Sequence, residues 1–94
     1  QDINVSYNDI VTIPDFPDNA ALVSFNGCHN FFEDVSGLKD LMSLNYVYLD
    51  YNNISDINVL AGCYNLIQVN VFRTNVTDVS ALQEMDVIIS YNPT

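Results

Sequence analysis

Three aspartates, Asp34, Asp56 and Asp78, stand twenty-two residues apart, and each precedes a valine or isoleucine. If the chain repeats with that period, their carboxylates form a column at the ~5 Å spacing of neighbouring parallel strands. Carboxylate pairs at that separation serve retaining glycosidases, and such a column could also bridge calcium. Each aspartate can instead cap the turn that follows it, and no general-acid environment surrounds any pair. We therefore predict turn capping, with calcium bridging as the alternative, and no resident metal.

The other reactive residue types do not combine into a catalytic motif. His29 is the single histidine, and it adjoins Cys28, so on a strand the two side chains diverge. No Ser-His-Asp or Cys-His arrangement and no phosphate-binding glycine loop is present. Cys63 stands where the preceding unit has Leu41, which predicts a buried apolar residue rather than a disulfide with Cys28. The sequence therefore predicts no enzyme and no cofactor.

Composition excludes several classes of partner. The chain has 94 residues, enough for one domain, of which 49% are hydrophobic and 15% charged. Two basic residues stand against twelve acidic ones, giving a net charge of −10, which argues against nucleic acid and anionic membrane surfaces. No apolar run is long enough to span a membrane, and the start of the sequence lacks the features of a signal peptide. We expect a soluble protein without membrane insertion.

The twenty-two-residue period extends to the apolar positions. Around Asn52, apolar residues lie five and three positions before it and two, five and eight positions after it. The same offsets recur in the other units, with Gly27 as the one small residue where the others are large. The four units have their origins at Asn8, Asn30, Asn52 and Thr74. We predict a single domain over residues 1–94, about four repeats plus a shortened last strand ending at Asn92, which arrives four residues early.

The spacing within a unit indicates its elements. Apolar residues at period two, such as Val47 and Leu49, predict a short strand at the start of each unit. Apolar residues spaced by three then predict a helical or 3₁₀ turn on the opposite side. Pro14 and Pro17 predict an irregular return in the first unit, from Pro14 to Ala21. Three polar residues at the start of these turns are predicted helix N-caps: Ser36, Asn58 and Ser80.

An asparagine recurs where each strand turns away, and its amide can satisfy backbone groups that no strand pairing reaches. The predicted asparagine ladder consists of Asn8, Asn30, Asn52 and Asn92.

These signatures together resemble a known family. The residues that carry the resemblance are Leu44, Val47, Leu49, Asn52, Ile54, Asp56, Ile57 and Leu60, echoed at Asn30, Phe32, Asp34, Val35 and Leu38 and at Val76, Asp78, Val79 and Leu82. The pattern resembles leucine-rich repeat proteins, most closely the internalin-like class of twenty-two-residue repeats. The resemblance implies an α/β solenoid: a right-handed coil with a parallel β-sheet on the concave face and short 3₁₀ or irregular turns on the convex face. It also implies an extracellular or cell-surface bacterial protein.

The residues between the inward positions of each strand should project together from the concave face. Aligned on the repeat origins, Gln68, Asn70 and Phe72 would match Asp86, Ile88 and Ser90 of the last strand. A further column directly precedes the origins at the rim: Tyr7, His29, Tyr51, Arg73 and Tyr91. Tyrosine, phenylalanine and arginine dominate interface hot spots, although tyrosines also suit strands for packing alone. The predicted ligand-binding residues are Tyr46, Tyr48, Asp50, Tyr51, Phe72 and Arg73.

Two functions from different classes follow. The resemblance implies a recognition module that binds a protein through the concave face, as internalins do, and aromatic residues there would also suit a glycan. The alternative is a rigid spacer between other domains, without a ligand. Bare ends of the solenoid predict a fragment of a longer protein or self-association by edge pairing. Three Asn-X-Ser/Thr motifs, at Asn4, Asn53 and Asn75, are either glycosylation acceptors or by-products of the repeat.

Overall fold

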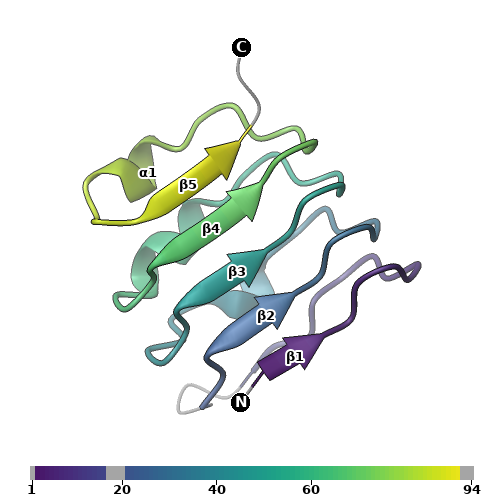
Figure 1. Ribbon diagram of the computed structural model, residues 1–94, viewed down its shortest axis with the longest axis horizontal. Coiled ribbons are helices and arrows are strands. Elements are labelled where there is room, and N and C mark those ends of the chain that lie inside the picture. The colour runs from purple at the N-terminus through teal and green to yellow at the C-terminus, as the bar shows by residue number, and fades with distance from the viewer. Residues whose placement is uncertain (1, 17–20, 92–94) are drawn as a thin grey trace.

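A computed structural model describes residues 2–16 and 21–91, and within them the chain winds as a coil with one strand in each turn (Figure 1). The strands form a five-stranded parallel sheet in the order β1-β2-β3-β4-β5, so chain order and sheet order coincide. The elements in chain order are β1 (Asp2–Asn4), β2 (Ser24–Asn26), η1 (Ser36–Leu38), β3 (Tyr46–Tyr48), η2 (Asn58–Gly62), β4 (Gln68–Val71), α1 (Ser80–Gln83) and β5 (Ile88–Tyr91). This confirms the predicted α/β solenoid.

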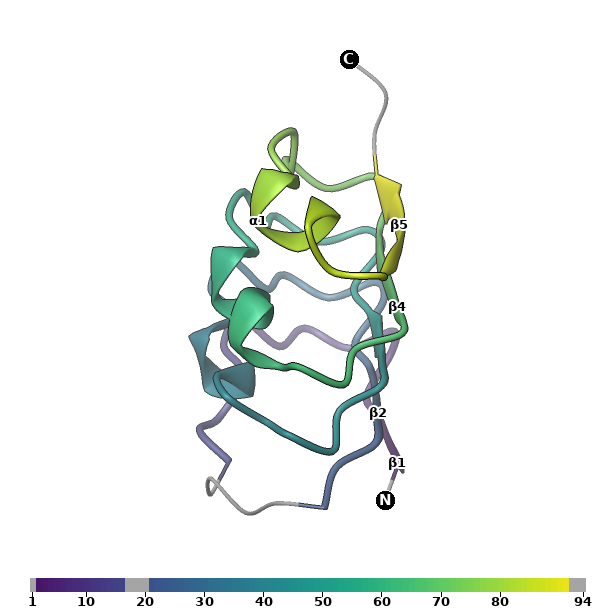
Figure 2. The same cartoon turned by 90° about the vertical axis from the view of Figure 1, so that its left-hand side faces the viewer.

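The sheet forms one side of the coil, and η1, η2 and α1 form the other (Figure 2). From β2 onwards, each strand joins the next through a right-handed crossover, as parallel strands almost always do. One hydrophobic core lies between the two sides and contains the inward residues of both. No helix of the described segments is long and apolar enough to cross a membrane.

The register of the sheet follows the repeat. Asp2 lies opposite Ser24, Ser24 opposite Tyr46, and Tyr46 opposite Gln68, so each pairing advances by one repeat. The middle residue of each three-residue strand faces the core, and the residues on either side of it face outward. The inward residues of the three central strands, Phe25, Val47 and Val69, are buried.

Gly27, the one small residue in the apolar pattern, has a packing explanation. A Cβ atom at Gly27 would lie 2.5 Å from Phe32 Cε2 and 2.9 Å from Phe25 Cε2. The two phenylalanine rings, 6.2 Å apart between centroids, therefore fill the volume that a larger residue occupies in the next coil, where Leu49 is buried. In the second repeat, Gly27 replaces the large inward residue, and the Phe25 and Phe32 rings fill the space that it leaves.

The turns opposite the sheet begin one residue earlier than predicted. Ser36, Asn58 and Ser80 are the first residues of η1, η2 and α1, so the prediction that they are N-caps was wrong. The N-cap positions belong to the apolar residues that precede them, and those make no side-chain cap. The spacing by three is confirmed, because Leu38, Leu41 and Leu44 are all buried in one unit, as are Leu60, Cys63 and Leu66 in the next.

The last strand is two residues out of the predicted alignment. Gln68 lies opposite Ile88 and Asn70 opposite Ser90, whereas the sequence alignment placed Gln68 beside Asp86. The chain between the two strands is therefore shorter than a full repeat by two residues rather than four. Asn92, the predicted end of this strand, lies outside the described residues, and β5 is described to Tyr91.

Candidate functional site

The outer face of the sheet, here called the strand face, presents a pair of tyrosines at its centre. Tyr46 and Tyr48 are both half-buried, and their rings lie parallel within 9° with centroids 6.4 Å apart. That distance matches two residues of strand rise, so the backbone of β3 sets the spacing of the rings. On β4, Gln68 Nε2 donates to Asn70 Oδ1 at 3.2 Å, which orders the amides beside the tyrosines. The result is a fixed aromatic and amide surface.

Asp50 and Phe72 join two coils just beyond these strands. The backbone N–H of Phe72 donates to Asp50 Oδ1 at 2.6 Å, and Cys28 Sγ lies 4.0 Å from Asp50 Oδ2. Partial burial raises the pKa of the Asp50 carboxyl, although the Phe72 hydrogen bond and the nearby His29 oppose that shift. Burial likewise raises the pKa of the Cys28 thiol, and the charge of Asp50 adds to the rise. A carboxyl group is thus held in a partly apolar setting beside Phe72.

The rim column has an unusual backbone. Tyr7, His29, Tyr51 and Arg73 have φ between 59° and 63°, in the left-handed region that is unfavourable for residues with a Cβ. The His29 ring stacks on both Tyr7 and Tyr51, with centroids 4.2 Å apart in each pair. The Arg73 guanidinium carbon lies 5.2 Å from the centroid of Phe72. The column is therefore a stack of three rings followed by a cation–π pair.

The asparagines at the repeat origins connect successive coils. Asn52 Nδ2 donates to Gly27 O and Leu49 O, both at 2.9 Å, and its Oδ1 accepts from the N–H of Phe32 at 3.0 Å. Asn30 makes the corresponding bonds one coil earlier, and both residues are buried. Asn8 is exposed and bonds only within its own coil among the described contacts, to Val5 O at 2.8 Å.

Thr74 replaces the asparagine in the fourth unit. Its hydroxyl donates to Val71 O at 2.6 Å and accepts from the N–H of Val76 at 3.2 Å. Both bonds remain within the fourth unit, so this buried threonine performs the local part of the asparagine's role.

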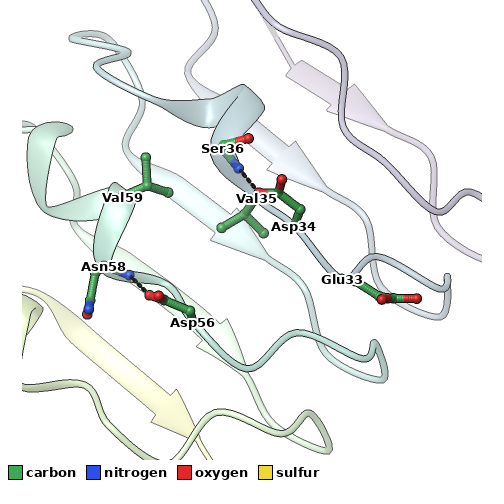
Figure 3. A pocket seen from close by; sticks show the side chains of 7 residues that line it. All are labelled: Glu33, Asp34, Val35, Ser36, Asp56, Asn58 and Val59. Atoms are coloured by element: carbon green, nitrogen blue, oxygen red, sulfur yellow. Dashed lines mark hydrogen bonds between the residues drawn. The ribbon is translucent and has the colours of Figure 1, made fainter.

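The aspartate column accepts hydrogen bonds from the turns that follow it. The backbone N–H groups of Ser36, Asn58 and Ser80 donate to Asp34, Asp56 and Asp78 at 2.8, 2.8 and 3.0 Å. Figure 3 shows the first two of these bonds at a hollow of about 380 Å³. The Ser80 backbone and hydroxyl donors lower the pKa of Asp78. The described residues contain no group of three or more His, Cys, Asp or Glu that could hold a metal ion.

Solved structures provide the comparison with known proteins. Internalin C2 of Listeria monocytogenes matches 95% of this chain with a TM-score of 0.80 and 26% sequence identity. An internalin, InlF, of the same species matches 76% of it with a TM-score of 0.67 and 31% identity. The chain is an internalin-like leucine-rich repeat. It spans 40% of the length of the first structure and 21% of the second. No protein-family model matches the sequence, and no curated protein does.

Within this leucine-rich repeat, the predicted binding residues fall into two groups. Tyr46 and Tyr48 lie on the strand face itself. Asp50, Tyr51, Phe72 and Arg73 lie beyond the strands, where the repeats turn towards the rim. Tyr48 is opposite Asn70, so Phe72 stands two residues farther along the chain than the tyrosine's partner. The groups are adjacent parts of one surface rather than a single compact cluster.

Sequence reasoning missed Phe31 and the stacking of the rim rings. Phe31 is 50% exposed and shares a hollow with the rim stack. It stands directly after a repeat origin, at a position that the other units of the leucine-rich repeat give to Asp9, Asn53 and Asn75. That replacement of a polar residue by an aromatic one was the available signal.

Proposed function

We propose that the chain is a non-enzymatic protein-recognition module and that it binds its partner through the strand face and the adjoining rim. The observation that carries this proposal is the parallel pair of Tyr46 and Tyr48, half-buried at the centre of the face, with Phe72 36% exposed beyond it. Tyrosine provides large contact area with little side-chain entropy to lose, which is why it is enriched in binding surfaces. The internalin-like fold supports the same function.

Charge supports this use of the face. The outward residues of β2, β3 and β4 are neutral: Ser24, Asn26, Tyr46, Tyr48, Gln68 and Asn70. The chain as a whole carries a net charge of −10, so its acidic residues lie mainly elsewhere. A neutral aromatic and amide surface can be desolvated at lower cost than a charged one. We further propose, from the resemblance to internalins, that the module acts outside a bacterial cell or at its surface.

The test is an affinity capture with the immobilised 94-residue chain against extracellular proteins and glycans. The variant Tyr48→Ala/Phe72→Ala should lose the captured partner while keeping the circular dichroism spectrum and melting behaviour of a folded protein. Tyr64→Ala is the matched control, because Tyr64 is 73% exposed and lies outside the five strands. Retention by the double variant would place binding elsewhere. Capture of nothing by the parent would favour a spacer.

A further inference from the structure

The rim contains a hollow whose lining shares only Tyr51 with the residues predicted to bind the protein partner. It has a volume of about 400 Å³ and lies beside the ring stack of the first three repeats. Its lining includes three exposed aromatic residues, together with His29, and polar groups from the first repeat. The lining residues that matter here are Tyr7, Asn8, Asp9, His29, Phe31 and Tyr51.

Exposure of these aromatic residues is not explained by packing. Tyr7 is 76% exposed, Phe31 50% and Tyr51 48%. Phe31 is the departure from the repeat, since Asn53 and Asn75 fill the same position in later units and are exposed there. A solvent-exposed phenylalanine in place of an asparagine adds apolar surface beside two other exposed rings without adding to the core, and such grouped apolar surface is typical of interaction sites.

Hydrogen bonds and ring stacking hold the lining of the hollow in place. The Tyr7 N–H donates to Cys28 O at 2.9 Å, and the Phe31 N–H donates to Ile10 O at 2.8 Å, so both backbones are tied to a neighbouring coil. His29 is held between two rings, and its backbone is fixed in the left-handed region. A preformed arrangement of this kind lowers the entropy lost on binding.

The chemistry of the lining selects a class of ligand. Its charged side chain is the Asp9 carboxylate, and neither Lys nor Arg lines it, which disfavours phosphate and other anions. The half-exposed Phe31 ring suits the C–H groups of a sugar, because these carry partial positive charge and meet the negative face of an aromatic ring. The Asp9 carboxylate and the tyrosine hydroxyls suit the sugar's hydroxyl groups. We propose that the rim hollow binds a neutral pyranose unit of a glycan, as a site separate from the strand face.

The proposal can be tested by NMR titration of the 94-residue chain with N-acetylglucosamine trimer, cellotriose and mannotriose. Each sugar is added to about 10 mM, a tenfold excess over a millimolar dissociation constant. At least one should shift the backbone amide signals of Tyr7, Asp9 and Phe31 in a saturable way. The same titration with casein-derived peptides tests the competing class of ligand.

Variants make the result specific. Phe31→Asn installs the residue that later repeats carry at this position, so it should fold, and it should weaken sugar binding by about fivefold or more. Tyr64→Ala and Tyr48→Ala should bind as the parent does, because neither residue lines the hollow. Absence of saturable shifts with all three sugars, unchanged affinity in Phe31→Asn, or rim shifts with peptides alone would each overturn the proposal. A loss in Tyr48→Ala would assign the sugar to the strand face instead.

Discussion

Asp50 accepts a hydrogen bond from the backbone N–H of Phe72, with 2.6 Å between Oδ1 and N. The contact joins the third repeat to the fourth, and both residues belong to the proposed recognition surface. Because the carboxyl is partly buried beside Phe72, its position depends on the packing of two coils rather than on one side chain. The pKa of the Asp50 carboxyl should therefore depend on how the third and fourth repeats pack at this surface.

We predict that Asp50 titrates above 3.8, the ordinary value for an aspartate, because burial disfavours its charged form. With the folded pKa raised, Asp50 contributes most to stability below its unfolded pKa, and this contribution is lost as pH rises through the folded pKa. Carboxyl ¹³C NMR measures the titration. Asp50→Asn should gain stability relative to the parent as pH rises through this window. A midpoint at or below 3.8 would contradict the prediction.

The asparagine ladder should stabilise the coil unequally along its length. Asn52→Ala leaves buried carbonyls and the Phe32 N–H without their partner, which should cost about 3 kcal/mol or more of unfolding free energy. Asn52→Thr should cost an intermediate amount, because the described hydrogen bonds of the Thr74 hydroxyl run to Val71 and Val76 of its own repeat. Asn8→Ala is the control and should cost less than about 1 kcal/mol, since Asn8 is exposed. Urea denaturation measures all three, and equal losses would contradict the ladder.

Gly27→Ala should destabilise the protein by about 1–3 kcal/mol, because its new methyl group would overlap the Phe32 and Phe25 rings. The loss should shrink in a Phe32→Leu background, since the smaller side chain leaves room for the methyl group. A double-mutant cycle from denaturation curves measures this coupling. If Gly27→Ala costs the same in both backgrounds, the exchange of volume between these residues is not the reason for the glycine.

The repeat allowed most of the fold to be predicted, but it could not fix the last strand. A slip of one residue would turn the inward side chain of β5 outward, so the apolar pattern excludes it. A slip of two residues leaves Ile89 facing inward and Ile88 outward, and the pattern is satisfied either way. The alignment relied on Asn92 as a repeat origin, whereas the length of the connection and the pairing with β4 decide the register.

The candidate surface was predictable as columns of residues but not as contacts. The sequence identifies Tyr7, His29 and Tyr51 as one column because they share a repeat offset. It does not indicate the left-handed backbone, since that region is uncommon for tyrosine and depends here on backbone hydrogen bonds to the adjoining coils. Ring stacking at 4.2 Å then follows from the backbone geometry and the spacing of the coils.

The two cysteines should differ in reactivity towards a disulfide reagent such as Ellman's. Both are free; Cys63 is fully buried with its thiol 3.1 Å from Leu38 O, whereas Cys28 is half-buried. We expect Cys28 to react slowly, because burial raises its pKa and reduces the thiolate fraction. The backbone hydrogen bond of Asp50 opposes this rise, and the charge of the Asp50 carboxylate adds to it. Cys63 should react only on unfolding.

Asp50→Asn should speed the modification of Cys28, because it removes the negative charge that opposes thiolate formation while keeping the shape of the side chain. Mass spectrometry of the labelled peptides assigns the site, and the urea-unfolded chain, in which both thiols react rapidly, is the control. Faster labelling of Cys63 than of Cys28 in the folded protein, or slower labelling of Cys28 in Asp50→Asn, would contradict this arrangement. The expected result would show that Asp50 acts on both of its neighbours: it holds Phe72 through a hydrogen bond and restrains Cys28 through its charge.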